Sequence, residues 1–175
     1  MGAERGTIES DMPISQLVNR LRIYLGVFML GLVLSGLTAF PLRTELPMVI
    51  GVLRHLGAPA QSALILWLNK VDEVLESTGQ QYPFLAYGTD WLGFAHLVIA
   101  AAFIGAWRDP VRNKWLFTFG LLNCAAVVPF ALIAGEARDI PFYWRLIDCS
   151  FGVLGAIPLW ICTRYVARIE QAGKN

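Results

Sequence analysis

Four apolar runs, each long enough to cross a lipid bilayer, constrain this chain more than any other feature. They cover residues 23–40, 84–107, 115–134 and 142–163. A helix needs about 20 predominantly apolar residues to cross the roughly 30 Å of hydrocarbon in a bilayer. The chain is 56% hydrophobic and 15% charged, against roughly 45–50% apolar residues in ordinary soluble domains. The sequence therefore predicts an all-α integral membrane protein with four transmembrane helices in a bundle.

The apolar runs also predict the domain organisation. We expect a cytoplasmic N-terminal segment over residues 1–22, a single membrane domain over 23–163 and a cytoplasmic C-terminal tail over 164–175. Because a long, largely polar segment precedes the first run, and because that run is too long for the apolar part of a signal peptide, we expect it to be a retained anchor.

Residues 46–77 are apolar enough to suggest a fifth crossing. A crossing there would place Arg54, His55, Gly57 and Pro59 near the middle of the bilayer, where charged side chains are costly. The apolar residues on either side of the "GAP" sequence at 57–59 instead recur at helical spacing, which is typical of amphipathic helices at a membrane interface. We therefore predict an interfacial insertion over 46–77, formed by a pair of amphipathic helices on the extracytoplasmic side between spans one and two.

The distribution of basic residues predicts the orientation of the four spans. Lys and Arg accumulate in the cytoplasmic flanks and short loops of membrane proteins. With four spans, one side carries Arg5, Arg20, Arg22, Arg108, Arg112, Lys114, Arg164, Arg168 and Lys174. The other side carries the smaller set Arg43, Arg54, Lys70, Arg138 and Arg145. Both termini are therefore predicted to be cytoplasmic, and a fifth crossing would remove this asymmetry.

Polar side chains gather at the opposite, extracytoplasmic ends of the predicted spans. The candidate ligand-binding residues are Asp90, His96, Arg138, Arg145 and Asp148. Ionisable side chains within a span are functional candidates by default, so we predict a polar pocket at this mouth of the bundle. A purely structural network is the competing interpretation. Arg145 and Asp148 are three residues apart, on one face of a helix, and could pair locally.

The pocket could serve three classes of function. A non-catalytic role, in binding a ligand or lipid or as a subunit of a membrane complex, is the preferred interpretation. The first alternative is a membrane-embedded enzyme that modifies a lipid or small molecule, with His96 as acid or base, Asp90 or Asp148 orienting it, and an arginine holding an anionic group. The second is an oligomeric transporter or channel subunit, which would require self-association.

Other classes find little support in the sequence. The three cysteines, Cys124, Cys149 and Cys162, lie in apolar segments without the close spacing of a metal site. No cofactor is predicted, because the two histidines, His55 and His96, fall in an interfacial helix and a span, an unfavourable arrangement for two haem ligands. The net charge of +1 and the lack of basic runs argue against nucleic-acid binding. The expected partners are membrane lipid, a small molecule, a second copy or another membrane protein.

Several sequence runs resemble those of an uncharacterised group of small bacterial four-helix inner-membrane proteins. The runs are "SGLTAFPL", "AYGTDWLGFAH", "DPVRN" and "IPFYWRLIDCSFG". The resemblance covers roughly residues 29–163. It implies a location in the bacterial inner membrane and assigns no catalytic residue.

Overall fold

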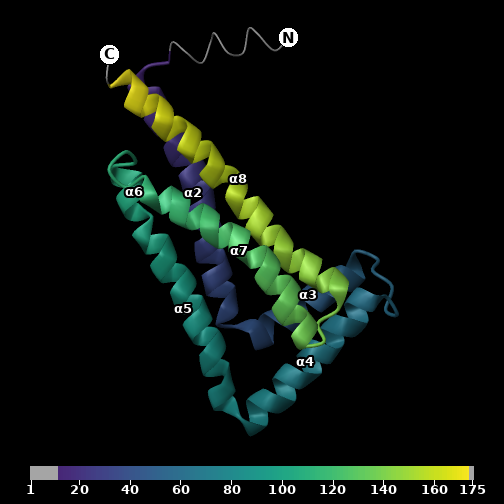
Figure 1. The fold of residues 1–175 in the computed structure, drawn as a ribbon. Coiled ribbons are helices and arrows are strands. Elements are labelled where there is room, and N and C mark those ends of the chain that lie inside the picture. Colours follow the sequence, from purple (N-terminus) through teal and green to yellow (C-terminus); the bar gives the residue numbers. More distant parts are fainter. Residues whose placement is uncertain (1–11, 174–175) are drawn as a thin grey trace. The chain divides into compact units, whose positions relative to one another are not determined.

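The computed structural model describes residues 12–173, and all regular structure in that range is helical (Figure 1). The helices are α2 (Ile14–Ala39), α3 (Leu42–His55), α4 (Ala63–Gln81), η1 (Pro83–Ala86), α5 (Tyr87–Ala102), α6 (Ile104–Arg108), α7 (Trp115–Ala137) and α8 (Phe142–Ala172). They form two compact units, which are described separately. The terminal unit contains the chain up to Gly31 and from Ala101 onward, and the central unit contains Leu32–Ala100.

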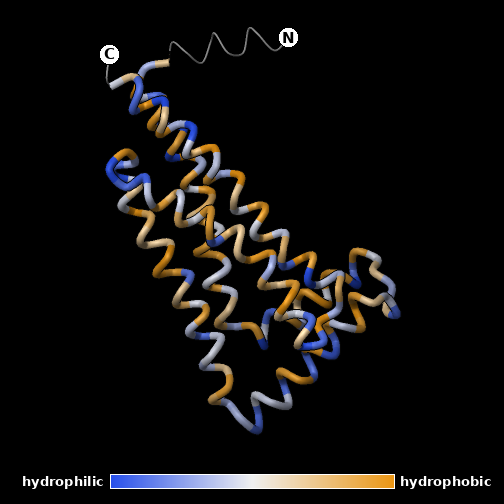
Figure 2. Tube along the Cα trace, viewed as in Figure 1, coloured by the Kyte–Doolittle hydropathy of each residue, from blue (hydrophilic) through white to orange (hydrophobic). Residues whose placement is uncertain are grey.

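Four helical stretches are long and apolar enough to cross a membrane. They are Ile14–Ala39, Pro83–Arg108, Trp115–Ala137 and Phe142–Ala172. The second joins η1, α5 and α6 into one stretch, with a break at Phe103. Figure 2 shows hydrophobic residues along most of their length. The predicted all-α fold with four candidate spans is confirmed, and helices α3 and α4 are not among the candidate spans.

Helices α2 and α8 are longer than the predicted spans, because their outer turns pack on each other in the terminal unit. Leu17 and Leu21 of α2 are buried, and so are Val166 and Ile169 of α8, in stretches that also carry several charged residues. Two contacts join the helices directly. The Cys162 Sγ lies 3.6 Å from the carbonyl oxygen of Leu21, and the rings of Tyr24 and Tyr165 stack with their centroids 6.1 Å apart. Burial of these apolar side chains stabilises helix where the average hydropathy alone is low.

Helices α7 and α8 lie side by side as an antiparallel hairpin in the terminal unit (Figure 1). Glycines allow this close approach. A Cβ atom added at Gly152 would lie 2.5 Å from the backbone oxygen of Cys124, and one added at Gly120 would lie 2.6 Å from Leu159 Cδ1. Small residues at a helix interface permit backbone contact and dispersion attraction, which drive helix association inside lipid. Both helices continue through an internal proline, at 129 and 158 respectively.

One end of the terminal unit is rich in positive charge. Its basic side chains are Arg20, Arg22, Arg108, Arg112, Lys114, Arg164 and Arg168. Two contacts bring their helices together at this basic end. Arg22 Nε donates to the Trp107 carbonyl oxygen at 3.1 Å, and Lys114 Nζ lies 2.7 Å from Glu170 Oε1. Figure 2 shows hydrophilic residues at the α6–α7 turn and in the last turns of α8.

In the central unit, α3 and α4 pack against each other through apolar faces. The buried residues are Leu46 and Ile50 on α3 and Ile65 and Leu68 on α4. The chain turns between the helices at Gly57, whose φ of +89° suits glycine. Helix α4 then begins after Ser62, whose hydroxyl accepts a hydrogen bond from the Ile65 amide at 3.4 Å. The chain therefore forms two helices with a break near "GAP", whereas their place as an amphipathic pair at the extracytoplasmic surface stays a prediction.

Polar contacts also join α3 and α4 at their exposed surfaces. Arg43 donates to Glu76 at 2.9 Å, Gln80 donates to the other oxygen of Glu76 at 2.6 Å, and Arg54 donates to the side chain of Asn69 at 3.2 Å. The hydrogen bond from Arg43, followed by that from Gln80, holds the pKa of Glu76 below its ordinary value of 4.5. Because these groups are exposed, the contacts orient the two helices more than they stabilise them.

The end of α2 packs on α5 within the central unit through two glycines. A Cβ added at Gly36 would lie 2.8 Å from the backbone oxygen of Gly93, and one added at Gly93 would lie 2.7 Å from the oxygen of Gly36. The backbones therefore touch at this crossing.

Candidate functional site

Arg145, in the predicted polar cluster, has a largely enclosed side chain. It lies in the first turn of α8, and its side chain is only 12% exposed. Its Nε donates to the carbonyl oxygen of Ile140 at 2.7 Å, and its Nη1 donates to the carboxylate of Glu136. The aliphatic part of the side chain lies against Gly135, where an added Cβ would come within 2.8 Å of it. Arg145 therefore clamps the beginning of α8 to the end of α7.

The turn between α7 and α8 has the local geometry that this clamp requires. The Ile140 amide donates to the Gly135 oxygen at 2.9 Å, and the Asp139 amide donates to the Glu136 oxygen at 3.2 Å. Asp139 has a φ of 54°, in the left-handed region. These features form a Schellman motif, in which a left-handed residue ends a helix and satisfies its last carbonyls. Aspartate tolerates this conformation better than most residues other than glycine.

Arg138 and Asp148, also in the terminal unit, do not share the clamp's contacts. Arg138 is exposed and caps the C-terminal end of α7 through its backbone amide. Asp148 lies half-buried on α8, within one turn of Arg145. The ion-pair partner of Arg145 is Glu136 rather than Asp148. The local pairing suggested by the three-residue spacing is therefore replaced by a pairing across the hairpin.

Asp90 and His96 lie in the central unit, both on α5. Asp90 is half-buried in the first turn, where a negative charge is favourable near the positive end of the helix dipole. The Nδ1 of His96 lies 2.8 Å from the Leu92 carbonyl oxygen. Because a carbonyl only accepts, Nδ1 carries the proton and, in the neutral ring, Nε2 is left as an acceptor. Since the five predicted residues divide between two units, their assembly into one pocket stays a prediction.

The contacts of these residues resemble structural contacts more than catalytic ones. A histidine base is usually oriented by a carboxylate on one ring nitrogen, whereas His96 uses Nδ1 to bond the backbone of its own helix. Within residues 12–173, no cluster of histidine, cysteine and carboxylate side chains could hold a metal ion. The cysteines, Cys124, Cys149 and Cys162, are buried and free.

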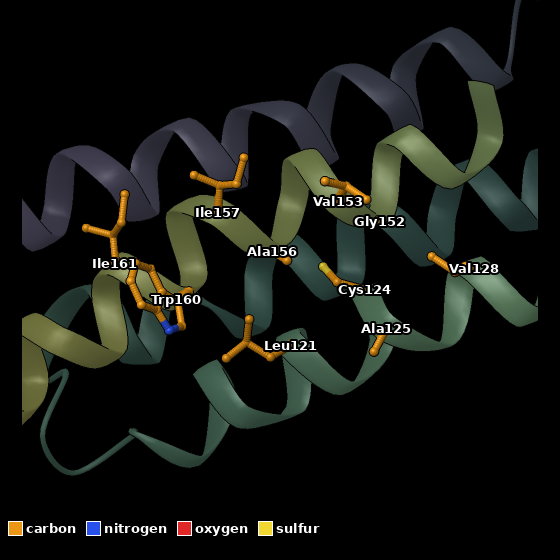
Figure 3. A pocket seen from close by; sticks show the side chains of 10 residues that line it. All are labelled: Leu121, Cys124, Ala125, Val128, Gly152, Val153, Ala156, Ile157, Trp160 and Ile161. Atoms are coloured by element: carbon orange, nitrogen blue, oxygen red, sulfur yellow. The ribbon is translucent and has the colours of Figure 1, made fainter. Parts of the chain in front are cut away.

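A concave feature lies elsewhere, along the α7–α8 hairpin of the terminal unit. It is an open groove of about 650 Å³. Its lining consists of Leu121, Cys124, Ala125, Val128, Gly152, Val153, Ala156, Ile157, Trp160 and Ile161. Figure 3 shows Trp160 and Leu121 toward one end and Gly152 and Val128 toward the other. The volume is within the roughly 300–1,000 Å³ of ordinary ligand sites, and the lining carries no charged side chain. We refer to this feature as the hairpin groove.

Comparisons with protein-family models, with curated proteins and with solved structures give no match for this chain. The function is therefore argued from the geometry of the chain's own residues.

Sequence reasoning missed two parts of this arrangement. Glu136 was not among the candidate site residues, because helical spacing pairs residues three or four apart and cannot show a partner nine residues away. The hairpin groove was also missed, since its small residues form a hollow only when α7 and α8 are placed side by side. The weak signal available was the pair of small residues Gly152 and Ala156, which predicts close packing but no cavity.

Proposed function

We propose that this chain is a non-catalytic integral membrane protein that binds a membrane lipid in the hairpin groove. The observation that carries the proposal is a mostly apolar groove of ligand size on two helices, α7 and α8, that are themselves apolar enough to cross a membrane. Some of the side chains that line it, such as Ile157 and Trp160, are half exposed. An apolar concave surface of this kind suits an acyl chain and offers few polar groups to a soluble substrate.

The polar cluster supports a structural role in this proposal. Arg145 has two acceptors in the hairpin itself, Glu136 and the Ile140 carbonyl, so its donors are used within the fold. His96 likewise bonds the backbone of its own helix. The lipid site is therefore assigned to the groove and not to the five residues predicted from sequence.

We further propose that the membrane is the bacterial inner membrane and that both termini are cytoplasmic. The resemblance of the sequence supports the membrane, and the gathering of arginines at the basic end of the terminal unit supports the orientation. In this topology α3 and α4 lie on the extracytoplasmic surface. The exposed apolar side chains of α3, Met48, Val49 and Val52, suit burial in the membrane interface.

The topology predicts a specific labelling pattern. Gln81, at the end of α4, and Gly173, after α8, are both exposed. A cysteine at Gln81 should react with a membrane-impermeant maleimide added to intact cells, whereas a cysteine at Gly173 should react only after the cells are opened. The native cysteines are buried, so the unmodified protein is the control for background labelling. Labelling of Gly173→Cys from outside would overturn the orientation.

The lipid-binding proposal predicts that filling the groove displaces lipid. Ala125 lines the groove on α7, and a phenylalanine there would occupy the space of an acyl chain. After purification in mild detergent, native mass spectrometry should find lipid bound to the unmodified protein and severalfold less bound to Ala125→Phe.

A neighbouring residue provides the matched control. Ala126 is exposed on the same helix but does not line the groove, so Ala126→Phe should retain as much lipid as the unmodified protein. Unmodified protein that carries no lipid, or equal loss of lipid in both variants, would contradict the assignment of the groove.

A further inference from the structure

We infer that the basic end of the terminal unit binds the phosphate of an anionic phospholipid, through Arg108 and Arg112 at the α6–α7 turn together with Arg22 of α2. This site shares no residue with the hairpin groove. The inference therefore goes beyond the proposed function, and it requires only that the helices on both sides of the turn cross a membrane.

The α6–α7 turn, residues 109–114, lies between two candidate spans. One of them ends at Arg108, and the next begins at Trp115. The tryptophans on the two sides of the turn, Trp107 and Trp115, are 37% and 60% exposed, and tryptophan is enriched at the level of the lipid head groups. When both spans cross the membrane, the turn therefore lies at the depth of the lipid phosphates.

Hydrogen bonds fix the backbone of this turn. The side chain of Asn113 donates to the carbonyl oxygen of Gly105 at 3.1 Å and to that of Asp109 at 3.0 Å. The carboxylate of Asp109 accepts a hydrogen bond from the Arg112 amide at 3.0 Å. A backbone that is already ordered loses little conformational entropy when a ligand binds, so the turn is prepared to present its arginines.

Arg22 brings a third guanidinium to the turn from a distant part of the sequence. Its Nε donates to the carbonyl oxygen of Trp107 at 3.1 Å, and Trp107 directly precedes Arg108. The ring of Trp107 lies against α2, where a Cβ added at Gly26 would come within 3.0 Å of it. These two contacts hold α2 beside the end of α6, so tertiary packing assembles the site.

The positive charges of the three arginines are not balanced by ion pairs. Within residues 12–173, none of the three forms an ion pair. The bond from Arg22 goes to a carbonyl group, which carries no net charge. Asp109 is the one acidic side chain of the turn, and Glu170 is already paired with Lys114 at 2.7 Å. The excess of guanidinium groups favours an anionic partner.

A lipid phosphate suits these donors. A guanidinium group donates two parallel hydrogen bonds to phosphate oxygens. Each basic residue near a membrane surface strengthens the attraction of anionic lipid by about fivefold. Phosphatidylcholine carries a positive charge beside its phosphate, so its net attraction to the site is weaker. The position of the turn between two spans makes a phospholipid, rather than soluble phosphate, the source of the anion.

The test uses the full chain reconstituted in nanodiscs that contain equal amounts of phosphatidylcholine and phosphatidylglycerol. After transfer to mild detergent, native mass spectrometry separates the two bound lipids by mass. Phosphatidylglycerol should be enriched about fivefold or more on the unmodified protein. Arg108→Gln and Arg112→Gln should each lower this enrichment severalfold, and Arg112→Lys should lower it less because lysine keeps the charge. Both arginines are exposed, and circular dichroism checks that the variants remain helical.

Arg20→Gln is the matched control. Arg20 is exposed on α2 and lies about 200° around the helix from Arg22, so its loss removes the same charge from the same end and should preserve the enrichment. An equal loss of enrichment in all three glutamine variants would indicate diffuse attraction and overturn the site. Loss of enrichment in excess inorganic phosphate, but not in chloride of equal ionic strength, would identify soluble phosphate as the ligand and overturn the assignment to lipid.

The groove-filling variant Ala125→Phe separates this inference from the proposed function. It should lose lipid from the hairpin groove and keep the enrichment of phosphatidylglycerol, because Ala125 lines the groove and is not part of the arginine site. Loss of the enrichment in Ala125→Phe would contradict a separate site. Unmodified protein that binds both lipids equally would overturn this inference and leave lipid binding in the groove intact.

Discussion

Replacing Gly152 by alanine is expected to destabilise the protein in detergent by about 1–3 kcal/mol, the usual range for overpacking a tight interface. The added methyl group would lie 2.5 Å from the backbone oxygen of Cys124 on α7. A backbone atom cannot rotate away as a side chain can, so α7 and α8 would have to separate. Separation would weaken the dispersion contacts that hold the hairpin together inside lipid. Thermal unfolding followed by circular dichroism measures the effect.

Gly31 offers the same substitution without the clash. A Cβ added at Gly31 in α2 meets nothing within 4 Å, so Gly31→Ala should be neutral or slightly stabilising through helix propensity. Comparing the two variants separates the effect of packing at the α7–α8 interface from the effect of intrinsic helix propensity. Equal melting temperatures for Gly152→Ala and Gly31→Ala would show that the α7–α8 approach does not hold in the folded protein. Gly152→Leu should be more damaging than Gly152→Ala, because more volume must be accommodated.

Replacing Arg145 by alanine should also destabilise the protein, by about 1–3 kcal/mol, through the loss of its hydrogen bond to the Ile140 carbonyl and of packing against Gly135. Had Asp148 been its partner, removal would leave an uncompensated buried carboxylate, at about 3–5 kcal/mol. Glu136 is 76% exposed, so water can solvate it once the arginine is lost. We therefore expect the smaller of the two losses in the free energy of unfolding, about 1–3 kcal/mol.

A double-mutant cycle identifies the partner directly. Glu136→Gln should reduce the effect of Arg145→Ala on the melting temperature, because the two side chains interact across the hairpin. Asp148→Asn should leave that effect unchanged. Coupling of Arg145 to Asp148, with none to Glu136, would contradict the observed pairing. Arg145→Lys provides a milder control, since lysine keeps the charge but lacks the fork that reaches two acceptors.

Much of the fold could be predicted because it depends on local composition. Apolar runs of membrane length marked the four candidate spans, and Gly57 and Pro59 marked the break between α3 and α4. The outer turns of α2 and α8 were missed for the same reason. Leu17 and Leu21 follow helical spacing, but the polar residues around them lower the mean hydropathy of any window that contains them. Their burial depends on contact with α8.

The candidate site was less predictable because it depends on which helices meet. The sequence indicated Arg145 as a candidate ligand-binding residue, which stays a prediction, whereas its ion-pair partner Glu136 is set by the turn at Asp139, whose backbone is left-handed. The groove requires the small residues of α7 and α8 to face one hollow, which no spacing within a single helix shows. The sequence thus indicated Arg145 as a charge in need of a partner. The packing of α7 against α8 determines that this partner is Glu136.

The clamp between Glu136 and Arg145 has a consequence for how the chain enters the membrane. In the proposed topology, the short turn that links α7 to α8 must be carried through the hydrocarbon during biosynthesis. Two opposite charges that form an ion pair are less costly to desolvate than the same charges apart. A helical hairpin that carries this ion pair near its tip therefore costs less to insert than one in which the two charges are separate.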